Sequence, residues 1–159
     1  MVTTDDLQFM KVAIAKADEG IRRGQTPFGS CIVKGGNIVC AEHNVVWATT
    51  DITAHAEVNA IRKACSALST IDLTGCTLYS SCEPCPMCFS AIHWANFDRV
   101  VFGARIADAQ RAGFNELTIS AEQMKSIGQS RVELTADVCR SEAAELFERW
   151  LARQDRRVY

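Results

Sequence analysis

The residues whose types and spacing could do chemistry lie in two short stretches, His55-Ala56-Glu57 and Pro84-Cys85-Pro86-Met87-Cys88. Catalytic zinc usually takes three protein ligands from His, Cys or carboxylate side chains and leaves its fourth position to water. His55, Cys85 and Cys88 would supply those three ligands. Water on zinc loses a proton more easily than bulk water does, and a nearby carboxylate that is not a ligand can accept that proton. The sequence therefore predicts one Zn²⁺ per chain, with Glu57 as a proton shuttle.

Neither stretch is specific on its own. A His-x-Glu pattern often arises by chance, and the cysteine stretch alone would equally suit a structural zinc knuckle or a redox-active pair. Together they are more specific, because they place ligands at two points of the chain with a spare carboxylate beside one of them. The combination H-x-E followed by P-C-x-x-C is typical of zinc-dependent nucleobase deaminases. A non-catalytic zinc site is closed by four ligands and needs no proton shuttle.

Cys82 raises a further alternative, because with Cys85 and Cys88 it forms a C-x-x-C-x-x-C run. An iron–sulfur motif of this kind commonly continues with a fourth cysteine in a C-x3-C spacing. That position is Ile92, so we expect no such cluster and predict that Cys82 is a buried residue at a strand end. The cysteines outside the run are predicted to be small buried hydrophobic residues. They are Cys31, Cys40, Cys65, Cys76 and Cys139.

Periodic patterns of apolar residues predict the elements that must position the two stretches. One helix is expected over residues 4–23, a second follows an N-cap at Asp51 or Thr53, and two more cover residues 84–95 and 141–153. The second helix carries the apolar stripe Val58, Ile61, Cys65 and Leu68. Five strands are expected at residues 28–34, 38–44, 76–80, 99–104 and 132–135, the first two joined as a hairpin. Residues 45–53 are expected to be a loop, and residues 108–129 show only a capping box from Ser120 to Gln123.

Both stretches fall at the starts of expected helices. With about 3.6 residues per turn, His55 and Glu57 flank the apolar stripe of their helix from opposite sides. Cys85 and Cys88 share one face of the next helix, and Pro86 suits its first turn. A helix N-terminus also favours a thiolate over a thiol. The order of elements predicts an α/β fold, a mixed five-stranded sheet covered by helices, in one domain spanning residues 1–159.

Composition narrows the class of protein. Hydrophobic residues make up 48% and charged residues 23% of the 159 residues, which is ordinary for a globular protein. We find no apolar run near the ~20 residues of a membrane span and no secretory signal, so we expect a cytoplasmic protein without a membrane partner. A net charge of −2 argues against nucleic acid as a partner, although a local basic patch stays possible.

The sequence resembles the cytidine deaminase superfamily, in particular the branch of bacterial guanine deaminases and tRNA adenosine deaminases. The resemblance runs from about residue 28 to 116. It rests on Pro27-Phe28-Gly29, His43-Asn44, residues 55–64, residues 81–88 and Ala112-Gly113-Phe114, with the aromatic C-terminal Tyr159 pointing towards guanine deaminases. It implies a three-layer α-β-α fold, a homodimer, and hydrolytic removal of an amino group from a small heterocycle.

Carried over by position, the resemblance implies that His55, Cys85 and Cys88 bind zinc and that Glu57 moves protons. The candidate substrate-binding residues are Asn44, Phe28, Glu116, Trp94 and Tyr159. From the residues alone, Asn44 would be a strand-end turn residue, Phe28 and Trp94 would be core, and Glu116 would be a solvated loop acid. His93 is expected at the surface or an interface. Trp47 would either cover the pocket or simply pack.

The chain departs from guanine deaminases where they resemble Gly-Phe-Asp-Asp, because it has Gly113-Phe114-Asn115-Glu116. A carboxylate that accepts N–H groups from the edge of guanine would then be one methylene longer. The basic C-terminal tail is either a solvated charge cluster or a segment that closes an active site, its own or a partner's.

From the resemblance to guanine deaminases we predict conversion of guanine to xanthine. The alternatives are another amino heterocycle (a nucleoside, pterin, cytosine or aminotriazine) and the adenosine of a tRNA.

Overall fold

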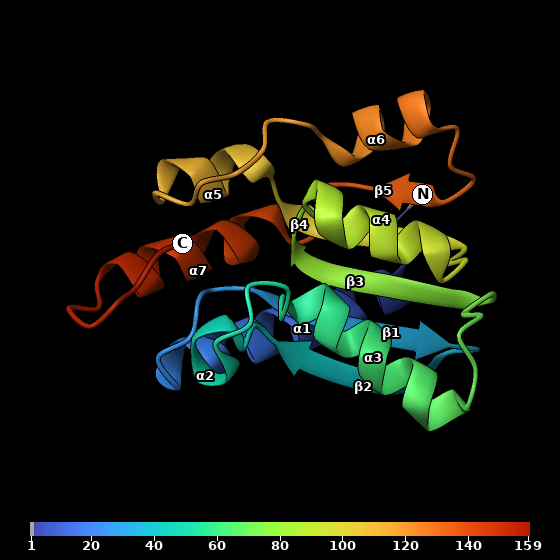
Figure 1. Cartoon of the computed structure of the whole chain (residues 1–159), viewed down its shortest axis with the longest axis horizontal. Helices are drawn as coiled ribbons and strands as arrows, with labels where there is room; N and C mark the ends of the chain where they lie inside the picture. Colours follow the sequence, from blue (N-terminus) through green and yellow to red (C-terminus); the bar gives the residue numbers. More distant parts are fainter. Residues whose placement is uncertain (1) are drawn as a thin grey trace.

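A hairpin begins the sheet. Gly35 and Gly36 have φ angles of 55° and 77°, which favour glycine, and they reverse the chain between the first two strands. The computed structural model describes residues 2–159, and its five strands form one sheet in the order β2-β1-β3-β4-β5 (Figure 1). The strands are β1 (Gly29–Lys34), β2 (Asn37–His43), β3 (Cys76–Cys82), β4 (Arg99–Ala104) and β5 (Glu133–Thr135). β1 pairs antiparallel with β2 and β3, whereas the β3–β4 and β4–β5 pairs are parallel.

Helices cover both faces of this sheet (Figure 1). They are α1 (Thr4–Arg22), α2 (Val46–Thr49), α3 (Ala56–Leu68), α4 (Pro86–Trp94), α5 (Ile106–Arg111), α6 (Ala121–Gly128) and α7 (Arg140–Leu151). Core residues of α1, α5 and α7 form one hydrophobic cluster, and those of α3, α4 and α6 form the other. The predicted α/β fold with a mixed five-stranded sheet between helices is confirmed. None of the helices within residues 2–159 is both long and apolar enough to cross a membrane.

Alternation along the strands explains the two clusters. Successive side chains of a strand point to opposite faces, so a strand covered on both sides is apolar at almost every position. Tyr79 and Val101 face the α1 side, while Leu78 and Val100 face the α3 side. Because β3 and β4 are parallel, their carboxyl ends meet at one edge of the sheet, and the chain leaves β3 there directly into the cysteine stretch.

Most predicted elements are confirmed within a few residues, and the exceptions are local. Residues 45–53 are not all loop, because α2 forms a short helix within them. The N-cap position of α3 is held by His55 and not by Asp51 or Thr53. Its fully buried face consists of small residues and Glu57, whereas the predicted stripe of larger apolar residues is half-buried. Helix α5 was not predicted, and α6 starts at the predicted capping box after Ser120.

The predictions for the cysteines are confirmed in part. Cys82 is buried at the end of β3, as expected, and Cys31 and Cys76 are also buried. The remaining three outside the motif, Cys40, Cys65 and Cys139, are only half-buried. All eight cysteines are free thiols in this structure.

A buried ion pair ties α1 to the sheet. The Asp6 side chain is 1% exposed and accepts hydrogen bonds from Arg99 Nη1 (2.7 Å), Tyr79 Oη (2.9 Å) and the Thr3 backbone N–H (2.9 Å). Burial alone would raise the pKa of Asp6, but the bonds from Arg99, Thr3 and Tyr79 lower it well below its usual range. Because the folded protein holds this carboxylate more tightly than the unfolded chain does, the network stabilises the fold above about pH 4 and loses that contribution at lower pH.

We expect Asp6→Ala to lower the free energy of unfolding by about 3 kcal/mol or more at pH 7, because it leaves a partly buried guanidinium unpaired. Asp5→Ala is the matched control, since Asp5 lies in the same helical turn but is exposed. Urea denaturation at pH 7 and at pH 3 measures both variants. The difference between Asp6→Ala and the wild type should shrink at pH 3, and an equal loss for the two variants at pH 7 would contradict this role of Asp6.

Candidate active site

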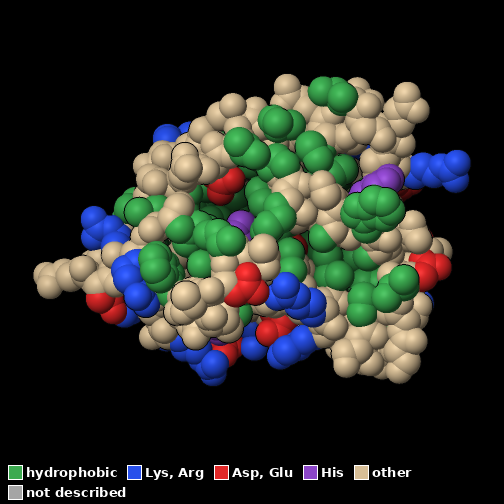
Figure 2. Space-filling view, viewed as in Figure 1, with side chains coloured by type: hydrophobic (Ala, Val, Ile, Leu, Met, Phe, Trp, Pro, Cys, Tyr) green, Lys and Arg blue, Asp and Glu red, His purple; other side chains and the backbone are tan. Residues whose placement is uncertain are grey.

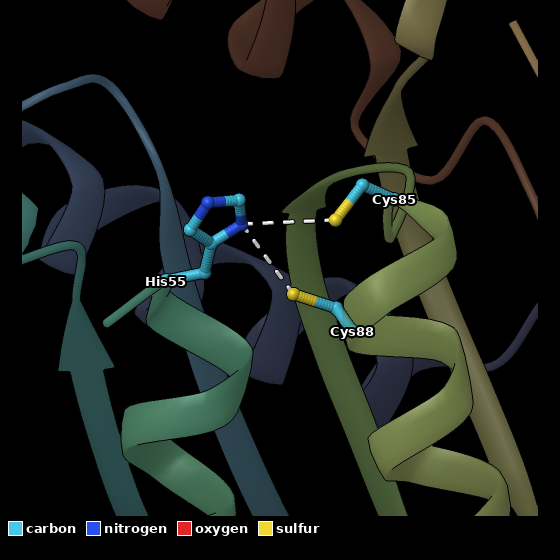
Figure 3. A group of neighbouring side chains, drawn as sticks. All are labelled: His55, Cys85 and Cys88. Carbon is cyan, nitrogen blue, oxygen red and sulfur yellow. Dashed lines mark hydrogen bonds between the residues drawn. The ribbon is translucent and has the colours of Figure 1, made fainter. Parts of the chain in front are cut away.

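Two helix starts meet at the edge of the sheet where β3 and β4 end. His55 is the N-cap residue of α3 and Cys85 is the N-cap residue of α4, both with extended backbone, and neither side chain caps its own helix. Both side chains are therefore free to point at each other (Figure 3). The first N–H groups of a helix lack intrahelical partners and carry partial positive charge, which favours thiolates beside them.

His55, Cys85 and Cys88 form a compact donor cluster. The His55 Nδ1 atom lies 3.7 Å from Cys85 Sγ and 3.5 Å from Cys88 Sγ, and all three donor atoms are within 4.8 Å of one another. In a tetrahedral site with bonds of about 2.1 Å to nitrogen and 2.3 Å to sulfur, the nitrogen and sulfur atoms would be about 3.6 Å apart. The cluster therefore has the donor types and the spacing that a zinc ion requires.

The two cysteines of the cluster share a proton unequally. A hydrogen bond from the Cys88 thiol lowers the pKa of Cys85 to about 4, and further bonds from His55 act in the same direction. Cys88, as the donor of that bond, has a raised pKa. Cys85 is thus a ready thiolate in the protein itself. A dication among the three donors would deprotonate Cys88 as well.

Glu57 lies beside the cluster in the first turn of α3. Its side chain is 5% exposed, its Oε1 accepts a hydrogen bond from Ser80 Oγ (2.9 Å), and its Oε2 accepts one from the Cys88 thiol (3.5 Å). Burial, followed by the negative charge of Cys85, raises the pKa of Glu57. The raised pKa is typical of a carboxyl group that both accepts and releases a proton near neutral pH.

A pocket opens onto the cluster. It has a volume of about 350 Å³, within the usual range for small-molecule sites, and its lining includes His55, Cys85 and Glu116. Figure 2 shows it as a hollow bordered by hydrophobic side chains, with histidine and acidic side chains visible inside. Glu116 is not the solvated loop acid that the residues alone would suggest. Its burial, followed by the negative charge of Cys85, raises its pKa to about 7.

A larger cavity, about 820 Å³, lies at the other ends of β3 and β4 and includes no residue of the cluster.

The end of the chain covers this pocket. The Tyr159 ring lies 5.6 Å from the His55 ring and 5.7 Å from the Phe114 ring, centroid to centroid. The Asn44 amide donates to the Tyr159 hydroxyl at 2.6 Å. Trp47 donates through Nε1 to the Arg157 carbonyl (3.1 Å), so it holds the tail down and is not merely packed.

Two predicted substrate contacts lie elsewhere. Phe28 does not line the pocket but packs edge-on against Phe114, with ring centroids 5.0 Å apart, so Phe114 forms the aromatic wall. Trp94 is the last residue of α4 and is 82% exposed, which contradicts its expected core position, and it does not line the pocket of its own chain. His93 is exposed, as predicted, and its Nδ1 atom lies 3.1 Å from the Oγ atom of Ser130.

Comparison with known proteins identifies the family. The model of the cytidine and deoxycytidylate deaminase zinc-binding region matches residues 3–104. The chain belongs to this family. It is 49% identical over 115 residues to the guanine deaminase of Bacillus subtilis (72% of this chain, 74% of that protein). It is 44% identical over 96 residues to the tRNA-specific adenosine deaminase of Aquifex aeolicus (60% and 64%). The solved guanine deaminase from Nitrosomonas europaea superposes with a TM-score of 0.86 at 26% identity (96% and 87%).

The protein is therefore a zinc-dependent hydrolytic deaminase with a cluster suited to one metal ion. Sequence reasoning missed two residues of this deaminase site. Ser80, which donates to Glu57, is one of several small polar residues in β3 and gave no signal of its own. Phe114 was part of a recognised motif, but its place in the pocket depends on the path of the chain after α5.

We expect Cys88→Ala to lose zinc and deaminase activity together, because two donors cannot hold the ion as three do. Cys82→Ala is the matched control. Cys82 is buried six residues earlier in the same cysteine run, but its Sγ contacts the Arg105 carbonyl (3.6 Å) and not the cluster. Zinc per chain, measured by atomic emission after dialysis, should approach zero in Cys88→Ala and one in Cys82→Ala. A full zinc content in Cys88→Ala would show that the ligands are other residues.

Proposed function

We propose that the protein is a guanine deaminase that hydrolyses guanine to xanthine and ammonia. The observation that carries the proposal is the pairing of a metal-binding cluster with two carboxyl groups, the buried Glu57 beside the cluster and the half-buried Glu116 in the pocket. One carboxyl group suits proton transfer and the other suits the N–H edge of an aminated purine. The 49% identical relative from Bacillus subtilis is a guanine deaminase, which supports the same substrate here.

In this proposal His55, Cys85 and Cys88 are the zinc ligands of a single deaminase domain that spans residues 1–159. Bound zinc would lower the pKa of water and so supply a nucleophile at neutral pH. Glu57 accepts a proton from the attacking water as the oxygen bonds to the amino-bearing ring carbon. It passes this proton to the ring nitrogen, then takes the second proton from the newly bonded hydroxyl group and delivers it to the amino group, so that the C–N bond breaks, ammonia leaves and a carbonyl forms. Ser80 holds Oε1 of Glu57, and Oε2, which here accepts from the Cys88 thiol, would face the reacting atoms once zinc has deprotonated Cys88.

Substrate selection is proposed for residues on the other side of the pocket. Glu116, as a carboxylate, would accept two N–H groups from the edge of guanine, and its side chain is one methylene longer than an aspartate in that place. Asn44 would bond a ring carbonyl or nitrogen. Its amide now donates to the Tyr159 hydroxyl, so substrate and Tyr159 would share this group or exchange it. Tyr159 would then cover the bound base.

We further propose that the protein is a cytoplasmic homodimer and acts without nucleic acid. The support for the dimer is a group of apolar side chains around α4 that a single chain leaves exposed to solvent. Met87, Trp94 and Ile127 are 36%, 82% and 81% exposed, and large exposed apolar groups are typical of an interface. Sedimentation equilibrium at micromolar concentration should give the mass of a dimer, and Trp94→Asp should shift it towards the monomer. A monomeric wild type would contradict this part of the proposal.

The substrate is tested by ammonia release from zinc-loaded protein. Guanine should be turned over faster than guanosine, adenine, cytosine, a pterin and an aminotriazine, with xanthine as the product. A transfer RNA with adenosine at the wobble position is included because relatives act on tRNA. Turnover confined to a pyrimidine or to the tRNA would overturn the proposed substrate.

We expect Glu57→Gln to keep zinc but to lose turnover by about 10³-fold, because the amide cannot accept and return a proton. Glu145→Gln, an exposed acid on α7, is the control and should keep wild-type kcat. Metal analysis and steady-state kinetics measure both effects. A kcat near that of the wild type in Glu57→Gln would remove the shuttle role.

Glu116 should give the reaction a pH dependence. Its pKa of about 7 means that the group is half protonated near neutral pH, and the protonated form cannot accept two N–H groups. We expect kcat/KM for guanine to fall as the pH drops below about 7, since this ratio reports the free enzyme. Glu116→Gln should have a lower kcat/KM and lack this limb of the profile. An unchanged profile in the variant would assign the limb to another group.

A further inference from the structure

Glu83 is a buried acid that the proposed mechanism does not use. Glu83 immediately precedes Pro84, the first residue of the cysteine stretch. It belongs neither to the donor cluster nor to the residues that line the pocket. Its side chain is 5% exposed. A buried carboxylate is costly unless its oxygens are hydrogen-bonded, so its partners should explain its presence.

Both oxygens of Glu83 accept hydrogen bonds from backbone groups. Oε2 accepts from the N–H of Ile106 (3.1 Å), and Oε1 accepts from the N–H of Ala121 (2.8 Å). Ile106 is the first residue of α5 and Ala121 is the first residue of α6. These N–H groups have no partner within their helices, and a negative charge stabilises a helix start. One side chain therefore joins two helix starts to the loop that holds Cys85.

The segment between these two bonds carries one wall of the pocket. Residues 106–121 include Phe114, Asn115, Glu116 and Leu117, all of which line the pocket. The Asn115 N–H also donates to the Tyr159 carbonyl (3.2 Å), so this segment holds the tail as well. The middle of the segment is the part most exposed to solvent, and its ends depend on Glu83 for their position relative to the cluster.

We propose that Glu83 is a positioning residue that holds the substrate-binding segment 106–121 against the metal-binding motif and thereby sets the affinity for substrate. The part of this inference that concerns affinity rests on the proposed function. The carboxylate is required because it offers an acceptor to each N–H group. A glutamine has one acceptor oxygen and would turn its own amide N–H₂ towards the other backbone N–H.

The structure provides a matched control in a second link between the same two helix starts. The Arg105 guanidinium binds Glu122 Oε1 (2.9 Å), from the residue before α5 to the first turn of α6. This pair is partly exposed, with Glu122 49% exposed, and exposed pairs contribute little. Glu122→Gln therefore removes an outer link, whereas Glu83→Gln removes half of the buried one.

The experiment compares Glu83→Gln, Glu83→Asp and Glu122→Gln with the wild type. Three quantities are measured: zinc per chain, KM and kcat for guanine, and hydrogen exchange of peptides within residues 106–121. We expect Glu83→Gln to keep one zinc, to raise KM about tenfold while kcat changes by less than about threefold, and to exchange faster in this segment. Glu83→Asp keeps both acceptor oxygens, so its KM and exchange rates should lie between those of Glu83→Gln and the wild type. Glu122→Gln should match the wild type.

Unchanged KM and unchanged exchange in Glu83→Gln with full zinc content would overturn the proposal. A loss of zinc with an unaltered segment would overturn it too, because Glu83 would then act on the metal motif alone. If Glu83→Gln does not fold, Glu83→Asp carries the same comparison. If the wild type does not deaminate guanine, the proposed substrate fails, while hydrogen exchange still tests whether Glu83 holds the segment.

Discussion

The site depends on two helices that begin side by side where the parallel strands end. At each start the N-cap position is given to a side chain that faces the site, His55 on α3 and Cys85 on α4, and neither caps its helix. Each helix thereby forgoes a cap that would be worth about 1 kcal/mol. The unpaired N–H groups left behind give the site a positive character that suits thiolates. The stability lost locally is recovered in the two hydrophobic clusters on either side of the sheet.

The sequence predicted the parts of this arrangement that depend on neighbouring residues. The spacing of Cys85 and Cys88 places both sulfurs on one face of one helical turn, and the order of helices and strands predicted a sheet covered by helices. The face of α3 was harder, because small residues such as Ala60 and Ala64 lie against the sheet while the larger Ile61 lies at its margin. Small side chains let a helix approach a sheet closely, so the larger apolar residue does not identify the buried face.

Contacts between distant residues could not be predicted in the same way. Asn44 and Tyr159 are 115 positions apart, and their hydrogen bond depends on how the tail returns after α7. The burial of Glu116 likewise depends on the path of residues 106–121, for which the sequence offered only a capping box. Trp94 was assigned to the core because it is large and apolar, yet it is 82% exposed. Hydrophobicity alone does not distinguish a core residue from an exposed one.

Three glutamates near the cluster show how partners decide the use of one chemical group. Glu57 accepts from the Ser80 hydroxyl on one oxygen and from the Cys88 thiol on the other, so it can exchange a proton beside the cluster. Glu83 has a backbone N–H on each oxygen, which occupies both and makes it a structural brace. Glu116 lines the pocket, where burial raises its pKa to about 7 and leaves it open to the N–H groups of a ligand. The proposed roles of the three glutamates in proton transfer, positioning and recognition therefore follow from hydrogen-bond partners and burial, because the side chains themselves are identical.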